Sequence, residues 1–169
     1  YEQEIELKDA HLAALQAQIN PHFLNNTLNL LGGMAVVKGV PEVYTIAKAV
    51  GEMFRYTVGY TQELVRLSKE LSHTNNYLLI QKHRFSGRCN VSVEVDSKVM
   101  DTPIPKFVLQ PIVENAFEHG LQKKKGEWRV AVKGMNQKRG VLLLVVDNGV
   151  GMPQNGLSEV RDKLRSNKD

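Results

Sequence analysis

The chain has 169 residues, of which 42% are hydrophobic and 24% charged, a globular balance that excludes wholesale disorder and suits one domain or a helical module joined to a compact α/β domain. The net charge of +4 is too small to indicate nucleic-acid binding by itself, and no apolar run approaches the roughly 20 residues that span a bilayer. The single cysteine, Cys89, fits a reducing compartment. Because the chain begins without Met and its first residues are charged, unlike a signal peptide, we expect it to be cut from a longer protein.

Residues 1–38 are predicted to be helical, with apolar positions at near-heptad spacing that suit a coiled coil. These positions are Ile5, Leu12, Leu15, Ile19, Leu24, Leu28 and Leu31. Gly39 and Pro41 end this helix, and a second helix runs from about Glu42 toward Tyr60. One hairpin of this size leaves its apolar stripe uncovered, so we expect dimerisation into a four-helix bundle. Packing of the stripe on the rest of the same chain is the alternative.

Two more helices are predicted farther along the chain. The third runs from Ser68 to about Phe85. The fourth carries apolar residues from Phe107 to Phe117, and Gly120 lies where a left-handed cap belongs.

Three segments are predicted to be strands. Val91–Val95 alternates apolar and polar residues, as does Trp128–Lys133. Val141–Val146 is a continuous apolar run, which is typical of a strand buried on both faces. With the two helices above, these strands predict an α/β half in which helices cover one sheet.

A first candidate site surrounds a proline in the first helix. Pro21 removes a backbone N–H and is expected to kink the helix at a cost of about 3 kcal/mol. His22 follows it, with amide side chains at positions 18, 20, 25 and 26, and Asn26 lies one turn beyond His22 on the same face. A neutral imidazole is a nucleophile, and the amides can orient a water or a phosphoryl oxygen. A solvated polar patch with one surface histidine is the alternative.

A second candidate site joins two segments of the α/β half. Glu114 and Asn115 interrupt an apolar helical face, and the amide oxygen of Asn115 is a suitable ligand for Mg²⁺. Asp147 ends a strand and is followed by Gly149 and Gly151, so its carboxylate can accept a hydrogen bond from an amine while backbone and base approach closely. Each signal is weak alone and stronger in this combination.

Four motifs together resemble the catalytic core of bacterial sensor histidine kinases of the LytS/YesM-type group. The resemblance extends from about Leu12 to Met152. The segments similar to the phosphoacceptor motif, the connecting helix, the N box and the first glycine box are Gln18–Asn29 (QINPHFLNNTLN), Tyr77–Phe85 (YLLIQKHRF), Ile104–Gly120 (IPKFVLQPIVENAFEHG) and Asp147–Met152 (DNGVGM).

The resemblance implies an α+β protein with two parts. Residues 1–63 would form the dimerisation and histidine phosphotransfer helices, a four-helix bundle in the dimer. Residues 64–169 would form a GHKL-type ATP-binding domain with an α/β-sandwich fold. The resemblance also implies ATP and Mg²⁺ as cofactors, a homodimer, and a response regulator receiver domain as partner. It implies no nucleic acid and no direct membrane contact from these residues, which would be the cytoplasmic portion of a membrane sensor protein.

The resemblance also assigns roles to single residues. His22 would be the phosphoacceptor, and Asn26 would match the residue that positions a water to remove phosphate from the partner. Asn115 would hold Mg²⁺, and Asp147 would bind the adenine amine. The residues that would shape or flank the nucleotide pocket are Gly149, Gly151 and His119.

The chain departs from the family pattern at several positions. Phe23 follows His22 where many sensor kinases carry an acidic residue. Either the reaction needs no general base, or another residue supplies it. Glu114 is a candidate for this base, and the alternative is that its side chain stabilises the fold. Pro111 replaces a polar N-box residue, and Glu118 stands where a basic residue is frequent.

The end of the chain is short for this family. The ATP lid, the second glycine box and the final strands are missing or shortened, although Ser158–Leu164 resembles the helix that follows that box. The ATP-binding domain is thus expected to be incomplete at its C-terminus and to bind nucleotide weakly or not at all in this chain by itself.

Two functions are compatible with these features. The first is an ATP-dependent protein-histidine kinase that autophosphorylates His22 and transfers the phosphate to an aspartate of a response regulator. The second is a non-catalytic dimeric signalling scaffold with a degenerate ATP domain. A nucleic-acid binder using Lys123–Lys125 is disfavoured because no aromatic residues interleave with that run.

Overall fold

The computed structural model describes residues 20–59, 63–138, 140–153 and 156–158. Helices and strands are both present, as expected for the α+β class. The chain divides into two compact units, the first made of Tyr1–Arg84 and Asp101–Gln110 and the second of Phe85–Met100 and Pro111–Asp169. These units describe how the chain packs. They do not test the predicted division into domains at 1–63 and 64–169, which stays a prediction. The expected helical residues 1–19 and the predicted helix beyond Ser158 lie outside the described residues.

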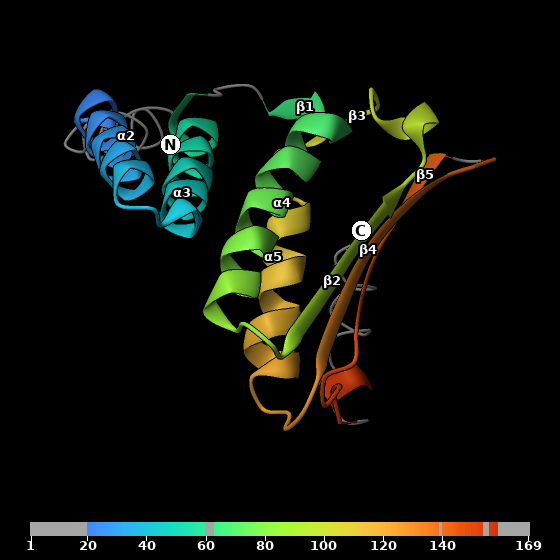
Figure 1. The fold of residues 1–169 in the computed structure, drawn as a ribbon. Coiled ribbons are helices and arrows are strands. Elements are labelled where there is room, and N and C mark those ends of the chain that lie inside the picture. Colours follow the sequence, from blue (N-terminus) through green and yellow to red (C-terminus); the bar gives the residue numbers. More distant parts are fainter. Residues whose placement is uncertain (1–19, 60–62, 139, 154–155, 159–169) are drawn as a thin grey trace, which may run out of the picture. The chain divides into compact units, whose positions relative to one another are not determined.

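The first unit begins with a helical hairpin, α2 (Pro21–Val37) and α3 (Pro41–Gly59), as predicted (Figure 1). Gly39 has φ +72°, a left-handed conformation that suits glycine at the end of a helix. The N–H of Val40 donates to the carbonyl of Ala35 at 2.9 Å, which satisfies a carbonyl of the last turn. Pro41 then starts α3, where its missing N–H costs nothing.

The predicted kink at Pro21 is wrong. Asn20 has an extended conformation with ψ 105°, and Pro21 is the first residue of α2 rather than an interior residue of a longer helix. A proline disfavours helical conformation in the residue before it, and asparagine is a preferred N-cap. Pro21 therefore begins the helix that carries His22, and the free-energy cost of a proline inside a helix does not arise.

Small residues lie where α2 and α3 contact each other. The buried residues of the pair are mostly glycine and alanine: Gly32, Ala35, Ala47, Ala49 and Gly51, with Tyr56. A Cβ on Gly32 would lie 2.9 Å from the Tyr44 ring. Several larger apolar side chains of the hairpin, including Leu30, Met34 and Val37, remain exposed, whereas the small residues Gly32 and Gly51 allow the two helices to approach closely.

The first unit also contains α4 (Leu67–Arg84), as predicted, and an unpredicted ribbon of β1 (Leu64–Arg66) and β3 (Pro103–Pro105). The two short strands pair antiparallel, with Val65 opposite Ile104. The alternating prolines of β3 donate no hydrogen bonds, which restricts this segment to a short edge pairing.

The second unit contains the three predicted strands in one sheet of order β2-β4-β5 (Figure 1). β2 (Cys89–Val95) runs parallel to β4 (Trp128–Gln137), and β4 is antiparallel to β5 (Gly140–Asp147). A short 3-10 turn, η1 (Ser97–Val99), follows β2. The buried core of this unit comprises Cys89, Val99, Val113, Ala116, Phe117, Leu121, Trp128, Val130 and Val132.

The expectation that the last strand is buried on both faces is wrong. No residue of β5 is fully buried, and the Val146 side chain is 50% exposed. Among the described residues, β5 lies at the edge of the sheet and pairs only with β4. A continuous apolar run reports hydrophobicity and does not reveal whether both faces of the strand are covered.

The fourth predicted helix is shorter and less regular than expected. α5 (Leu109–Asn115) begins after Phe107, and it continues into a π-helical turn, η2 (Ala116–Leu121). Gly120 lies inside this turn and is not a left-handed cap, whereas Phe107, predicted to be helical, has φ +60°. No helix in the described part of the chain is long and apolar enough to cross a membrane.

Candidate functional site

His22 lies in the first turn of α2, and its side chain is exposed. The side-chain oxygen of Asn20 accepts hydrogen bonds from the backbone N–H groups of His22, at 3.0 Å, and of Phe23, at 3.2 Å. These bonds satisfy two N–H groups that lack partners within the helix. The cap therefore orders the backbone of His22 and leaves its imidazole free to meet a reactant.

Asn26 lies beside the imidazole, as the spacing predicts. Its Nδ2 is 3.3 Å from Nδ1 and 3.4 Å from Nε2 of His22. An amide N–H can donate only to a ring nitrogen that carries no proton, so the tautomer of the ring decides which nitrogen accepts. The same unprotonated nitrogen carries the lone pair that can attack a reactant, so a reactant would have to displace the Asn26 amide from it.

A further polar contact, missed by the sequence analysis, joins the two helices near His22. Nη1 of Arg55 on α3 donates to Oδ1 of Asn25 at 3.4 Å, and Nδ2 of Asn25 donates to the carbonyl of Pro21 at 3.0 Å. Asn25 was noted only as one of several amides. Its neighbour on α3 could not be identified without the register of the hairpin.

In the second unit, the end of η2 and the start of the glycine loop meet. Oδ1 of Asp147 accepts a hydrogen bond from Gly149 N at 2.7 Å, and Val150 N donates to the Gly120 carbonyl at 3.1 Å. A Cβ on Gly149 would lie 2.5 Å from Gly120 Cα. The glycines thus permit a backbone contact that a side chain at either position would obstruct.

Asp147 is exposed at the end of β5, and its Oδ2 can accept a hydrogen bond from an amine outside the chain. Gly151 has φ +70°, so the loop after Asp147 turns at a residue that tolerates this conformation. Asn115 and His119 are also exposed, whereas Glu114 is half-buried and makes an interaction within the fold. The carboxylate of Asp147 and the glycine loop beside it are chemically compatible with the amine and the flat face of a nucleotide base.

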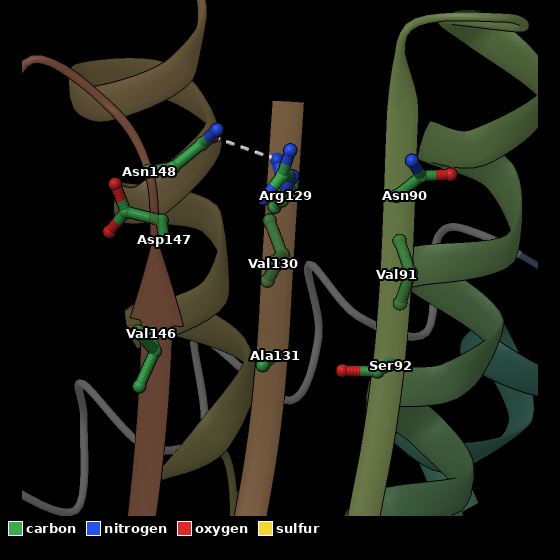
Figure 2. A pocket seen from close by; sticks show the side chains of 9 residues that line it. All are labelled: Asn90, Val91, Ser92, Arg129, Val130, Ala131, Val146, Asp147 and Asn148. Carbon is green, nitrogen blue, oxygen red and sulfur yellow. Dashed lines mark hydrogen bonds between the residues drawn. The ribbon is translucent and has the colours of Figure 1, made fainter. Parts of the chain in front are cut away.

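Asn148 holds this loop against the neighbouring strand, a role that the sequence analysis missed. Its Oδ1 accepts from Arg129 N at 2.8 Å, and its Nδ2 donates to the Glu127 carbonyl at 3.2 Å. Figure 2 shows the side chain of Asn148 reaching from the end of β5 toward Arg129 on β4. The Asp-Asn-Gly pattern suggests only a turn, because the partners of Asn148 lie on another strand.

A cavity of about 350 Å³ adjoins this end of the sheet. It is lined by residues of β2, β4 and the end of β5, including Ser92, Arg129 and Asp147 (Figure 2). The hydrogen bond from Arg129 to Glu127, and then the charge of Arg129, lower the pKa of the Glu127 carboxyl. Arg129 and Glu127, at and just before the start of β4, therefore form a hydrogen-bonded ion pair near the end of the sheet that carries Asp147.

A single metal ligand from the protein suffices for the expected cation. Within the described residues, no group of three or more His, Cys, Asp or Glu side chains is placed to hold a metal ion. Mg²⁺ usually keeps several waters and takes other ligands from phosphates, so the exposed amide oxygen of Asn115 is chemically compatible with it.

Comparison with known proteins gives consistent matches. The Histidine kinase family model matches residues 10–89. Sensor protein LytS of Bacillus subtilis is 38% identical over 96% of this chain, Sensor histidine kinase YesM of the same organism is 32% identical over 89%, and Sensor histidine kinase BtsS of Escherichia coli is 32% identical over 86%. The chain spans 28% of the length of the first of these relatives and 26% of the other two.

Solved structures are similar at a lower level, and one of them is a histidine kinase domain. The histidine kinase domain from the Erythrobacter litoralis EL346 blue-light activated histidine kinase matches with a TM-score of 0.44 and 15% identity, covering 92% of this chain and 76% of that one. A similarity at this level supports no structural inference.

Proposed function

Because the chain belongs to the LytS/YesM-type group of bacterial sensor histidine kinases, we propose that it autophosphorylates His22 from ATP and passes the phosphoryl group to an aspartate of a response regulator. The observation that carries the proposal is the exposed imidazole of His22 in the capped first turn of α2, with the amide of Asn26 beside it. An arbitrary surface histidine would not be expected to combine these features.

The proposed reaction is a pair of phosphoryl transfers. A ring nitrogen of His22 forms a bond to the γ-phosphorus as the bond to the bridging oxygen breaks, and ADP leaves with that electron pair. In the second step an aspartate oxygen of the regulator forms the new bond, and the nitrogen–phosphorus bond breaks. Such transition states are loose, so positioning and charge neutralisation matter more than strong base catalysis.

The nucleotide-side residues would divide the binding between them. Asp147 would accept a hydrogen bond from the adenine amine, and Gly149 and Gly151 would let the backbone approach the base. Asn115 would contribute an amide oxygen to Mg²⁺, which supplies charge neutralisation when bound. His119, next to Gly120 in η2, would flank the nucleotide.

Phe23 occupies the place of the acidic residue found in many sensor kinases, which leaves the base open. Its side chain is 70% exposed and offers no proton acceptor. Glu114 remains a proposal for this role, and its half-buried position with an interaction inside the fold supports the structural alternative equally.

An exposed apolar stripe on α2 supports the proposed homodimer. Phe23, Leu30, Met34 and Val37 follow each other at intervals of seven, four and three residues, and their side chains are 70%, 64%, 55% and 85% exposed. This spacing places them along one face of the helix. A second copy of the hairpin would cover the stripe and complete a four-helix bundle.

The partners of the whole protein follow from the same proposal. A response regulator receiver domain would receive the phosphate, and Asn26 would help to orient the water that later removes it. We further propose that these residues are the cytoplasmic portion of a membrane sensor protein and make no direct contact with the membrane or with nucleic acid.

Incubation of the full-length protein with labelled ATP and Mg²⁺ tests the proposal. Wild type should gain an acid-labile, base-stable label, and His22→Gln should gain none. His83→Gln is the matched control, because His83 is an exposed histidine on α4, outside the proposed site, and this variant should label like wild type. A wild-type protein that takes up no label would instead support a non-catalytic scaffold.

A further inference from the structure

Glu70, in the first turn of α4, is a carboxylate with no exposed surface. Burial of an ionised carboxylate is costly unless donors replace the water that it loses. Three donors do so: the Tyr56 hydroxyl and Phe107 N donate to Oε2, the latter at 3.1 Å, and Leu109 N donates to Oε1 at 3.1 Å. Glu70 is therefore a junction at which separate segments of the first unit meet.

The donors come from segments that are distant in the sequence. Tyr56 lies in the last turn of α3, and Leu109 is the first residue of α5, the helix that ends at Asn115. The first N–H groups of a helix have no acceptor within it, so Glu70 completes the start of α5. A continuous path of hydrogen bonds thus links the end of the hairpin to the start of the N-box helix.

The turn before α5 depends on the same contacts. Phe107 has φ +60°, which a residue other than glycine adopts only when its surroundings hold it there. Its ring lies edge-on to the rings of Tyr56 and His73, with centroids 5.5 and 5.6 Å away. Tyr56 and His73 stack on each other at 4.3 Å. A change at Tyr56 therefore reaches the backbone that precedes α5.

Lys106 adds a second connection between this turn and α3. Its Nζ lies 4.6 Å from the centroid of the Phe107 ring and donates to the carbonyl of Thr57 at 3.3 Å. Burial lowers the pKa of Lys106, and the charge of Glu70 acts in the opposite direction.

We propose that Tyr56 is a positioning residue for autophosphorylation and acts through Glu70 on the start of α5. The inference rests on the proposed function, because it assumes that His22 receives phosphate from nucleotide held by residues such as Asn115. Loss of the Tyr56 hydroxyl removes one of three donors to a buried carboxylate. It leaves the contacts around Asp147 intact, since they belong to the second unit. Slower phosphoryl transfer at unchanged ATP affinity is the consequence.

Autophosphorylation kinetics of the full-length protein test the inference, with Tyr56→Phe compared with Thr74→Val. Thr74 is a matched structural control, because it is buried on α4 and its hydroxyl donates to the backbone carbonyl of Glu70 rather than to the carboxylate. Each variant removes one buried hydroxyl hydrogen bond and should lower Tm by about 2–4 °C. Only Tyr56→Phe should lower kcat, by about tenfold, with KM for ATP within about twofold of wild type. Equal kcat in the two variants, or a raised KM at unchanged kcat, would overturn the inference.

A double-mutant cycle with Glu70→Gln asks whether Tyr56 acts through the carboxylate. The glutamine keeps the size of the side chain but exchanges one acceptor oxygen for a donor. If Tyr56 acts through Glu70, adding Tyr56→Phe to Glu70→Gln should reduce kcat no further, whereas a full additional loss would contradict the inference. Labelling of wild type at His22 separates the two proposals. If wild type takes up no label, the proposed function is overturned. If wild type is labelled but Tyr56→Phe and Thr74→Val have equal kcat, only the role of Tyr56 is overturned.

Discussion

Glu127, directly before β4, illustrates how a single residue helps to hold the loop that follows β5. Its carboxylate accepts hydrogen bonds from Arg129, at 2.9 Å, and from Asn90, while its backbone carbonyl accepts from Asn148. The side chain is exposed, so its ion pair contributes little stability. The pKa of Glu127 is instead useful as a measure of the local geometry near Asp147.

Replacement of Arg129 by Gln should raise the pKa of Glu127, because the hydrogen bond and charge that hold it below its usual range are removed. A carboxyl whose pKa is lowered on folding contributes stability above its unfolded pKa and loses it as pH falls through the folded pKa. The variant should therefore lose less stability between neutral pH and pH 3 than wild type. A carboxyl NMR titration with denaturation curves at several pH values measures both effects.

Arg66→Gln is the control, since Arg66 pairs with Asp101 in the other unit and does not contact Glu127. An unchanged Glu127 titration in Arg129→Gln would contradict the hydrogen bond and ion pair between these two residues at this end of the sheet.

At the level of elements, the contact between η2 and the glycine loop decides the shape of the proposed nucleotide site. A π-helical turn places its residues differently from an α-helix and is frequent at functional sites. Here it brings Gly120 against Asp147 and Gly149, with a Cβ on Gly120 predicted to lie 2.8 Å from Asp147 Oδ1. Glycine is needed at position 120 because a side chain would not fit there. Its backbone freedom is not what matters, since Gly120 does not have a positive φ.

Gly120→Ala should destabilise the protein by about 1–3 kcal/mol, because the added methyl group overlaps a carboxylate oxygen and the loop must shift. Urea denaturation measures this loss, and ATP affinity of the full-length protein should fall with it. Gly33→Ala is the matched control: Gly33 is an interior residue of α2, a Cβ there has nothing within 4 Å, and the change should stabilise by about 0.5–1 kcal/mol. Similar effects of the two substitutions would show that the close contact does not limit the fold.

The helices and the three strands of the sheet were predictable because local patterns produce them. Heptad-like spacing, the Gly39–Pro41 break and the period-two segments each act over a few residues. The β1–β3 ribbon was not predicted, because it pairs three-residue segments far apart in the chain, one of them carrying two prolines. The π-helical turn was also missed, since the local sequence pattern around Gly120 carries no signal for it.

At the scale of the whole molecule, the exposed stripe on α2 is the feature on which the proposed homodimer rests. Apolar surface of this extent on one helical face usually marks an interaction site. The small residues between α2 and α3 bring the two helices together without covering the stripe.

Met34→Lys should weaken the proposed dimer, because it places a charge in the middle of an apolar interface. Analytical ultracentrifugation of the full-length protein should show a dissociation constant at least about tenfold higher than that of wild type. Asn29→Lys is the control, since Asn29 is an exposed polar residue on the same helix and adds the same charge. If both variants have the same dissociation constant as wild type, another surface mediates dimerisation.

The sequence alone suggested the candidate site residues, since His22, Asn115, Asp147 and the loop glycines stand in motifs whose residue types suit the proposed chemistry. Which of them meet was decided by tertiary structure. Gly120 and Asp147 are joined by a turn whose geometry depends on packing, and Glu70 looked like an ordinary charged residue near the start of a helix. Its burial, with donors from α3 and from the turn before α5, depends on contacts between residues tens of positions apart, which no local pattern encodes.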